Sequence, residues 1–74
     1  MIRIGDSVRV TYKRNPKWNK FVGTVIETTN AMCYVEYSKE DMQEIRDTIA
    51  TGINFPAGWF SESLEKVHVS KELV

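Results

Sequence analysis

The sequence predicts a mainly β domain, a small and partly open barrel of five short strands with one inserted α-helix. Several short segments alternate apolar and polar residues with a period of two, which is typical of half-buried strands. One segment, at about 39–51, changes to helical spacing, and turn residues separate all of these segments. The chain has 74 residues, which predicts a single domain with a thin core.

The N-terminal part predicts two strands joined by a basic loop. Residues 7–12 alternate, and the side chains expected to face the core are Val8, Val10 and Tyr12. Asn15-Pro16 is a turn signal and proline lacks a backbone donor, so residues 13–20 are expected to form a loop. Residues 21–28 are rich in β-branched residues and predict the second strand. Gly23 within that run predicts a bulge or a sharp bend.

A short turn then leads to a predicted third strand at residues 33–37, which would complete a hairpin with the second strand. Alternation places Tyr34 on the opposite face from the inward residues Cys33, Val35 and Tyr37. Cys33 is interpreted as a small core residue.

The predicted helix, at about 39–51, lies between the third and fourth strands. Met42, Ile45 and Ile49 recur at helical spacing, so we expect them to cover one open end of the barrel. Ser38 and Asp41 match an N-terminal capping box, and Gly52 suits a C-terminal stop.

The C-terminal part predicts two further strands. Trp59 and Phe60 are adjacent, so in a strand only one of the two rings can face the core. A tight turn around Leu64 is expected to lead into a last strand with Val67 and Val69 inward. The domain would span residues 1–70, and residues 71–74 are expected to form a frayed tail.

The composition of the chain argues against several classes of function. Ten basic and ten acidic residues give a net charge of zero, so no overall field would draw the chain to a membrane or to nucleic acid. Cys33 is the only cysteine, which excludes an internal disulfide and favours a reducing, cytoplasmic location. No long apolar run or signal-peptide pattern is present, so no membrane partner is expected.

No residue pattern predicts catalysis, a metal or a cofactor. His68 has no ligand partner at a suitable spacing and is expected to face outward on the last strand. Ser61 and Ser63 lack the context of a nucleophile, and no glycine-rich phosphate loop occurs. The sequence therefore predicts a protein that is not an enzyme.

The order of segments resembles the SH3-like small barrels, through the opening GDSVRV, the VGTV strand and the closing WFSESLEKV. KWNKFVGTVIE, GIN and LEKV are similar to the small stromal accessory subunit of photosystem I, which docks on a larger complex. GDSVRV and VGTV also resemble KOW-type and Tudor-like barrels, which bind RNA, ribosomes, RNA polymerase or modified peptides. The acidic helical insert departs from both groups.

Charge is unevenly distributed along the chain. Residues 1–20 contain six cations and one acid, whereas residues 36–47 contain five acids and two cations. Such a dipolar surface orients a partner more than it binds one tightly. The candidate partner-binding residues combine the basic loop with two aromatic residues from predicted strands: Lys13, Arg14, Lys17, Trp18, Lys20, Tyr34 and Trp59.

Each candidate surface also has a purely structural interpretation. The basic residues could simply keep a loop soluble and bind nothing. Trp18 either packs inward or anchors an interface. The acidic side chains of the predicted helix could form a solvent-exposed face, or they could contact a basic partner. An exposed ring at position 59 or 60 could form, with Tyr34, an aromatic groove for a peptide, unless the helix covers it.

We expect a non-enzymatic protein-binding module, either an accessory subunit or a small inhibitor that docks on a larger protein assembly. Its short length would also suit a viral host-takeover factor. The alternative is a KOW-type barrel that binds RNA or DNA, with phosphate contacts from the basic loop 13–20 and stacking by Trp18.

Overall fold

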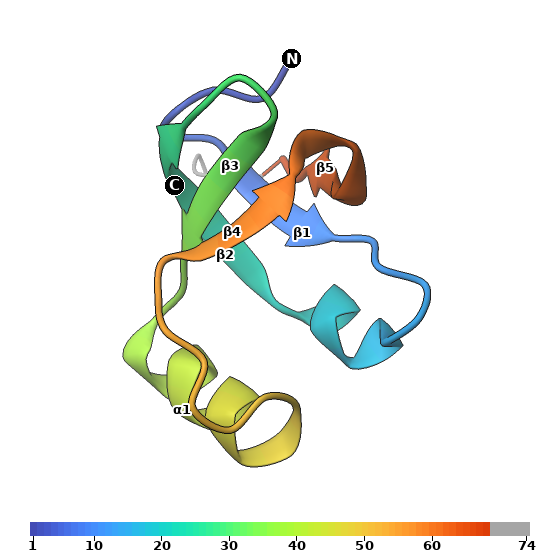
Figure 1. Ribbon diagram of the computed structural model, residues 1–74, viewed down its shortest axis with the longest axis vertical. Helices are drawn as coiled ribbons and strands as arrows, with labels where there is room; N and C mark the ends of the chain where they lie inside the picture. Colours follow the sequence, from blue (N-terminus) through green and yellow to red (C-terminus); the bar gives the residue numbers. More distant parts are fainter. Residues whose placement is uncertain (69–74) are drawn as a thin grey trace, which may run out of the picture.

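The structure, a computed structural model, describes residues 1–68 and consists of a five-stranded antiparallel sheet with one α-helix (Figure 1). The strand order is β4-β3-β2-β1-β5, and the helix lies between β3 and β4 in the chain. The elements are β1 (Ser7–Val10), the 3-10 helix η1 (Pro16–Lys20), β2 (Val22–Thr28), β3 (Met32–Glu36), α1 (Lys39–Thr48), β4 (Ala57–Phe60), the 3-10 helix η2 (Ser61–Ser63) and β5 (Leu64–Lys66).

The mainly β fold, the β2–β3 hairpin and the position of the helix confirm the prediction at this level. Within residues 1–68, no strand ladder joins β4 to β5, so the sheet is open and these two strands form its edges. The register aligns Val25 of β2 with Val35 of β3, and Cys33 with Trp59 of β4. No helix in the described part of the chain is long and apolar enough to cross a membrane.

The core lies on one face of the sheet and is built by the predicted alternation. Val8, Val10, Val25 and Val35 are fully buried, as expected for the inward positions of half-buried strands. α1 contributes Ile45, which has no exposed surface, and Met42 and Ile49 pack around the same cluster. Figure 1 shows α1 and η1 together at the lower end of the sheet. Both therefore cover that end of the core.

α1 begins where the sequence predicts and ends three residues earlier. The Ser38 hydroxyl accepts a hydrogen bond from the Asp41 amide at 3.1 Å, which satisfies one of the free N–H groups of the first turn. The helix ends at Thr48 rather than near residue 51. Gly52 has a φ of +83°, so it supplies the left-handed turn after the helix rather than its last residue.

Three predicted strand features are corrected. β1 ends at Val10, and Tyr12 beyond it is 38% exposed instead of buried. The register shift in β2 lies between Val25 and Glu27 and not at Gly23. Leu64 begins β5 instead of sitting in the turn, which is η2.

The expected basic loop contains a short 3-10 helix, η1, which begins at Pro16. The last predicted strand ends at Lys66, with Val67 half-buried and His68 exposed as expected. Val69, the boundary at residue 70 and the tail 71–74 lie outside the described residues.

Candidate functional site

Trp18 packs into the protein and is not a free ring on the basic segment. Only 5% of its surface is exposed. The ring contacts Trp59 edge-on, with centroids 4.8 Å apart, and lies 6.4 Å from the ring of Tyr37. The Asn15 side chain caps η1 by accepting from the Lys17 amide at 3.3 Å, which fixes the turn that directs Trp18 inward. The tryptophan therefore connects η1 to the core.

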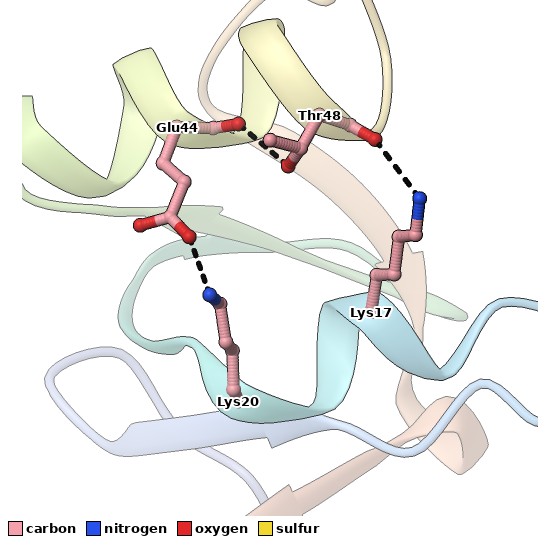
Figure 2. Close-up of polar contacts among 4 residues, drawn as sticks. All are labelled: Lys17, Lys20, Glu44 and Thr48. Carbon is pink, nitrogen blue, oxygen red and sulfur yellow. Dashed lines mark hydrogen bonds and ion pairs between the residues drawn. The ribbon is translucent and has the colours of Figure 1, made fainter.

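Lys17 and Lys20 point from η1 toward α1 (Figure 2). The Lys20 ammonium forms an ion pair with Glu44, and Lys17 Nζ donates to the carbonyl oxygen of Thr48 at 3.4 Å. Thr48 is the last residue of α1, where the helix dipole favours a cation. A small pocket of about 350 Å³ lies between η1 and α1 at this point. The basic segment and the acidic helix thus neutralise part of each other's charge.

Lys13 and Arg14 differ from these two lysines. Both side chains are exposed, and neither forms an ion pair or hydrogen bond within residues 1–68. The other predicted cations of the segment are held by α1, so Lys13 and Arg14 carry the charge that remains available to a partner.

An aromatic groove includes Tyr12, the residue directly before this pair of cations in the chain. It has a volume of about 270 Å³ and combines β4 with the residues that follow β1 and with η2. Phe60, with 55% of its surface exposed, forms one wall, and Tyr12, which directly precedes Lys13, lies 6.1 Å from the Trp59 ring. The residues that line the groove are Tyr12, Met32, Gly58, Trp59, Phe60 and Ser63.

Tyr34 lies beside the groove on the outer face of the sheet. It is paired with Gly58, and a Cβ atom at residue 58 would come within 2.8 Å of the Tyr34 ring. The absence of a side chain at Gly58 therefore lets the ring lie against the backbone of β4. The neighbouring Met32 side chain occupies the same face, because a Cβ at Gly58 would also approach its Cε at 3.0 Å.

The structure therefore divides the predicted site residues into three groups. Trp18 and Trp59 meet in the core, although Trp59 also reaches the groove. Lys17 and Lys20 contact α1, while Lys13 and Arg14 are exposed. Tyr34 covers Gly58.

Sequence reasoning missed Tyr12 and Met32 as groove residues, and it left open whether residue 59 or 60 supplies the exposed ring. Alternation showed that one of residues 59 and 60 must face outward, but only the fold identifies it as Phe60. The sequence predicts Tyr12 in the core, because the apolar alternation of β1 continues through it. No signal in the sequence distinguishes a strand that ends at Val10 from one that ends at Tyr12.

Two titratable groups in residues 1–68 have shifted pKa values. Burial raises the pKa of Tyr37 to about 12, and the nearby indole N–H of Trp59 opposes this rise. The two polar atoms lie close to each other but do not reach hydrogen-bond geometry. The Arg3 amide, which donates to Asp6 at 2.8 Å, lowers the pKa of that carboxyl group, and Lys66 adds to the effect. Neither Tyr37 nor Asp6 lines the groove, so these shifts do not bear on binding there.

A third pocket, of about 530 Å³, lies between the N-terminal residues and the β2–β3 turn. Glu62 is the one carboxylate among its lining residues, which are otherwise mostly apolar or hydroxyl-bearing. Within residues 1–68, no three His, Cys, Asp or Glu side chains are placed to hold a metal ion. The groove likewise contains no pair of groups arranged for acid and base chemistry, and its aromatic and apolar lining suits a side chain of a binding partner.

The chain was compared with protein-family models, curated proteins and solved structures. No family model matches it, and no curated protein or solved structure shows a significant match.

Proposed function

We propose that this protein is a non-enzymatic docking module, an accessory subunit or small inhibitor, that binds an acidic segment of a larger protein assembly. The partner would place an aromatic or aliphatic side chain in the groove formed by Tyr12, Trp59 and Phe60. Its acidic residues would lie near Lys13 and Arg14. The observation that carries the proposal is the exposed Phe60 ring in a groove that also includes Tyr12, directly before two cations that have no partner in residues 1–68.

The strand order supports an SH3-like fold for this module. In such barrels a short turn precedes the last strand, which pairs with the first. Here η2 precedes β5, and β5 pairs with β1 through Leu64 and Val10. Aromatic grooves on domains of this kind bind extended peptides through a few side-chain pockets. The open sheet and the helical insert are features particular to this chain.

The exposed aromatic residues and the unpaired cations favour a protein partner that has both apolar and acidic side chains. Large aromatic side chains at the centre of a groove contribute most to binding energy when a partner buries them. Unpaired cations at the rim attract acidic partners and accelerate association. The carboxylates of α1 do not fill this role internally, because Glu44 is paired with Lys20 at the opposite end of the basic segment.

Nucleic acid is the competing class of partner. Phosphate binding would use the cations of residues 13–20, and affinity depends on how many of them contact phosphates. Lys17 and Lys20 are engaged by α1, and Trp18 is buried away from any base that could stack on it. These contacts weaken the nucleic-acid interpretation relative to the protein-docking one.

The test is a selection of peptide ligands from a phage-displayed library of random 12-residue peptides, followed by affinity measurements on the full chain. We expect enriched peptides to combine acidic residues with a large apolar residue. Phe60→Ser should reduce affinity at least tenfold, and the double variant Lys13→Glu/Arg14→Glu should reduce it similarly. The matched controls are Ile26→Ser, which removes an exposed apolar side chain of β2, and Lys39→Glu on α1; both should bind normally.

The proposal is overturned if no peptide is enriched, or if binding is unaffected by the groove and loop variants. A parallel titration with labelled single-stranded and duplex oligonucleotides at low salt tests the competing class. Salt-sensitive binding of an oligonucleotide that the double charge reversal abolishes would replace the docking proposal.

A further inference from the structure

The hydrogen-bond pattern of β4 shows which of its backbone groups point away from the sheet. The Ser61 amide donates to the carbonyl oxygen of Ala31 at 3.2 Å. In an antiparallel ladder, bonds to one neighbour come from every second residue. Residues 61, 59 and 57 therefore face β3, and the N–H groups of Gly58 and Phe60 point outward.

The β2–β3 hairpin supports the same assignment independently. The carbonyl oxygen of Met32 accepts from the Thr29 amide at 2.8 Å, so the backbone of Met32 faces β2. Met32 is the register partner of Phe60. Because Met32 faces β2, the Phe60 N–H has no acceptor on β3.

The outward edge of β4 is accessible. Gly58 and Phe60 are exposed, whereas Ala57 and Trp59 pack inward. No loop of residues 1–68 pairs with these two amides. Natural sheets usually protect such edges with lysine, proline or a covering segment. Between residues 57 and 60 there is no such residue, although Pro56 limits the edge on its N-terminal side.

The aromatic groove includes this edge. Gly58 and Phe60 lie on the outer face of β4 and Trp59 on its inner face, yet all three line the same groove. Residues on opposite faces of a strand can share a groove only along its free side, because β3 occupies the other. A chain that fills the groove would therefore pass within reach of the Gly58 and Phe60 amides.

We infer that the partner binds as an extended strand added to β4, with its backbone carbonyls accepting from Gly58 and Phe60. This inference rests on the proposed function and specifies the conformation of the acidic segment. Strand addition of this kind gives affinity through main-chain hydrogen bonds and specificity through alternate side chains. With only two outward amides before η2, the pairing sets the orientation of the segment, and the groove supplies side-chain contacts.

Two matched variants separate the backbone contribution from the side chain. Phe60 has a φ of −65°, which is the value that proline requires, and its N–H makes no bond to β3. Phe60→Pro therefore removes the ring and the outward donor, whereas Phe60→Ala removes only the ring. With a peptide enriched in the library selection, we expect Phe60→Pro to bind at least fivefold more weakly than Phe60→Ala, at similar thermal stability.

The second measurement uses the unmodified protein and N-methylated versions of the same peptide. In a strand, alternate N–H groups face the neighbouring strand, so methylation should weaken binding at least tenfold at the alternate positions that lie opposite Gly58 and Phe60, and leave the others unchanged. Hydrogen exchange measured by NMR should show slowed exchange of the Gly58 and Phe60 amides in the complex.

The results distinguish failure of this inference from failure of the docking proposal. Peptide binding that depends on Phe60 and Lys13 but tolerates N-methylation at all positions would overturn strand addition and leave docking intact. If the protein binds no peptide at all, both the docking proposal and the strand-addition inference are overturned. Protection of the same amides in peptide-free protein, together with a concentration-dependent dimer in sedimentation, would assign the edge to a second copy and also overturn the inference.

Discussion

Gly23 shows how one residue can be correctly singled out for the wrong reason. Its backbone continues β2 without a register shift, which occurs after Val25. A Cβ atom at Gly23 would lie 2.4 Å from Val35 Cγ1 and 2.8 Å from the carbonyl oxygen of Glu36. The residue is small because the β3 segment lies directly against it, and not because the strand bends there.

Gly23→Ala should therefore destabilise the domain. One of the contacts is with backbone, which cannot rotate away, so we expect a loss of about 1–3 kcal/mol in the free energy of unfolding. Chemical denaturation monitored by tryptophan fluorescence would measure it. Gly52→Ala is not a suitable control because of its positive φ, so Thr24→Ala, an exposed position on the same strand, is preferable. An unchanged midpoint for Gly23→Ala would contradict the close contact.

Tyr37 links burial to the pH dependence of stability. Its pKa is raised to about 12 from a model-peptide value of 10.0. In the unfolded chain the phenol ionises from pH 10 upward, whereas in the folded protein it stays neutral. Its contribution to stability is therefore complete below pH 10 and is lost as the pH rises toward 12.

We expect the unfolding midpoint to fall between pH 10 and pH 12, and Tyr37→Phe to reduce that fall. Near pH 7 the variant should be about as stable as the parent, because the hydroxyl has no hydrogen bond of normal geometry. Thermal unfolding at a series of pH values would measure both effects. An identical alkaline decrease in parent and variant would show that another group is responsible.

α1 illustrates what local sequence signals specify for an element. Its start is marked by Ser38 and is found where the capping box predicts. The sequence predicts its end at about residue 51, because Ile49 and Gly52 extend the pattern. The helix stops at Thr48, where Lys17 of η1 donates to its last carbonyl group. Start signals lie within the helix sequence, whereas this end also involves a distant lysine.

Ser38→Ala should cost about 1 kcal/mol of stability, because it leaves an N–H of the first turn without its side-chain acceptor. Lys39→Ala, at an exposed neighbouring position, should have little effect. Helix content and denaturation midpoints measured by circular dichroism would test the difference. Equal midpoints for the two variants would show that the cap makes no net contribution.

The entire domain depends on a core that is small for its number of elements. A chain of this length is expected to have a stability of roughly 4–11 kcal/mol. Trp18 joins η1, β4 and the ring of Tyr37 in a single cluster. Loss of a large buried aromatic side chain typically costs about 3–5 kcal/mol. That cost is a large fraction of the free energy of unfolding of the whole domain.

Trp18→Ala is therefore expected to unfold much of the protein at 37 °C, in a single cooperative transition. Far-ultraviolet circular dichroism and the fluorescence of the remaining Trp59 should change together. Phe60→Ser, which changes an exposed ring, should leave the transition nearly unchanged. If Trp18→Ala were as stable as the parent, Trp18 would have to be reconsidered as an interface residue.

The sequence by itself determined the class of fold, the hairpin, the start of the helix and the inward residues of β1 and of the β3 segment. These features depend on periodicity and capping, which act over a few neighbouring residues. It also located the basic segment and an aromatic pair near the C-terminus, from which the candidate site is drawn.

Only the tertiary structure decided which of those residues are available to a partner. Trp18 became core and Lys17 and Lys20 became contacts of α1, whereas Lys13 and Arg14 stayed exposed after Tyr12 of the groove. The open edge of β4 likewise depends on which strands pair. Burial and pairing join residues that are distant in the chain, and neither can be computed from the spacing of neighbours.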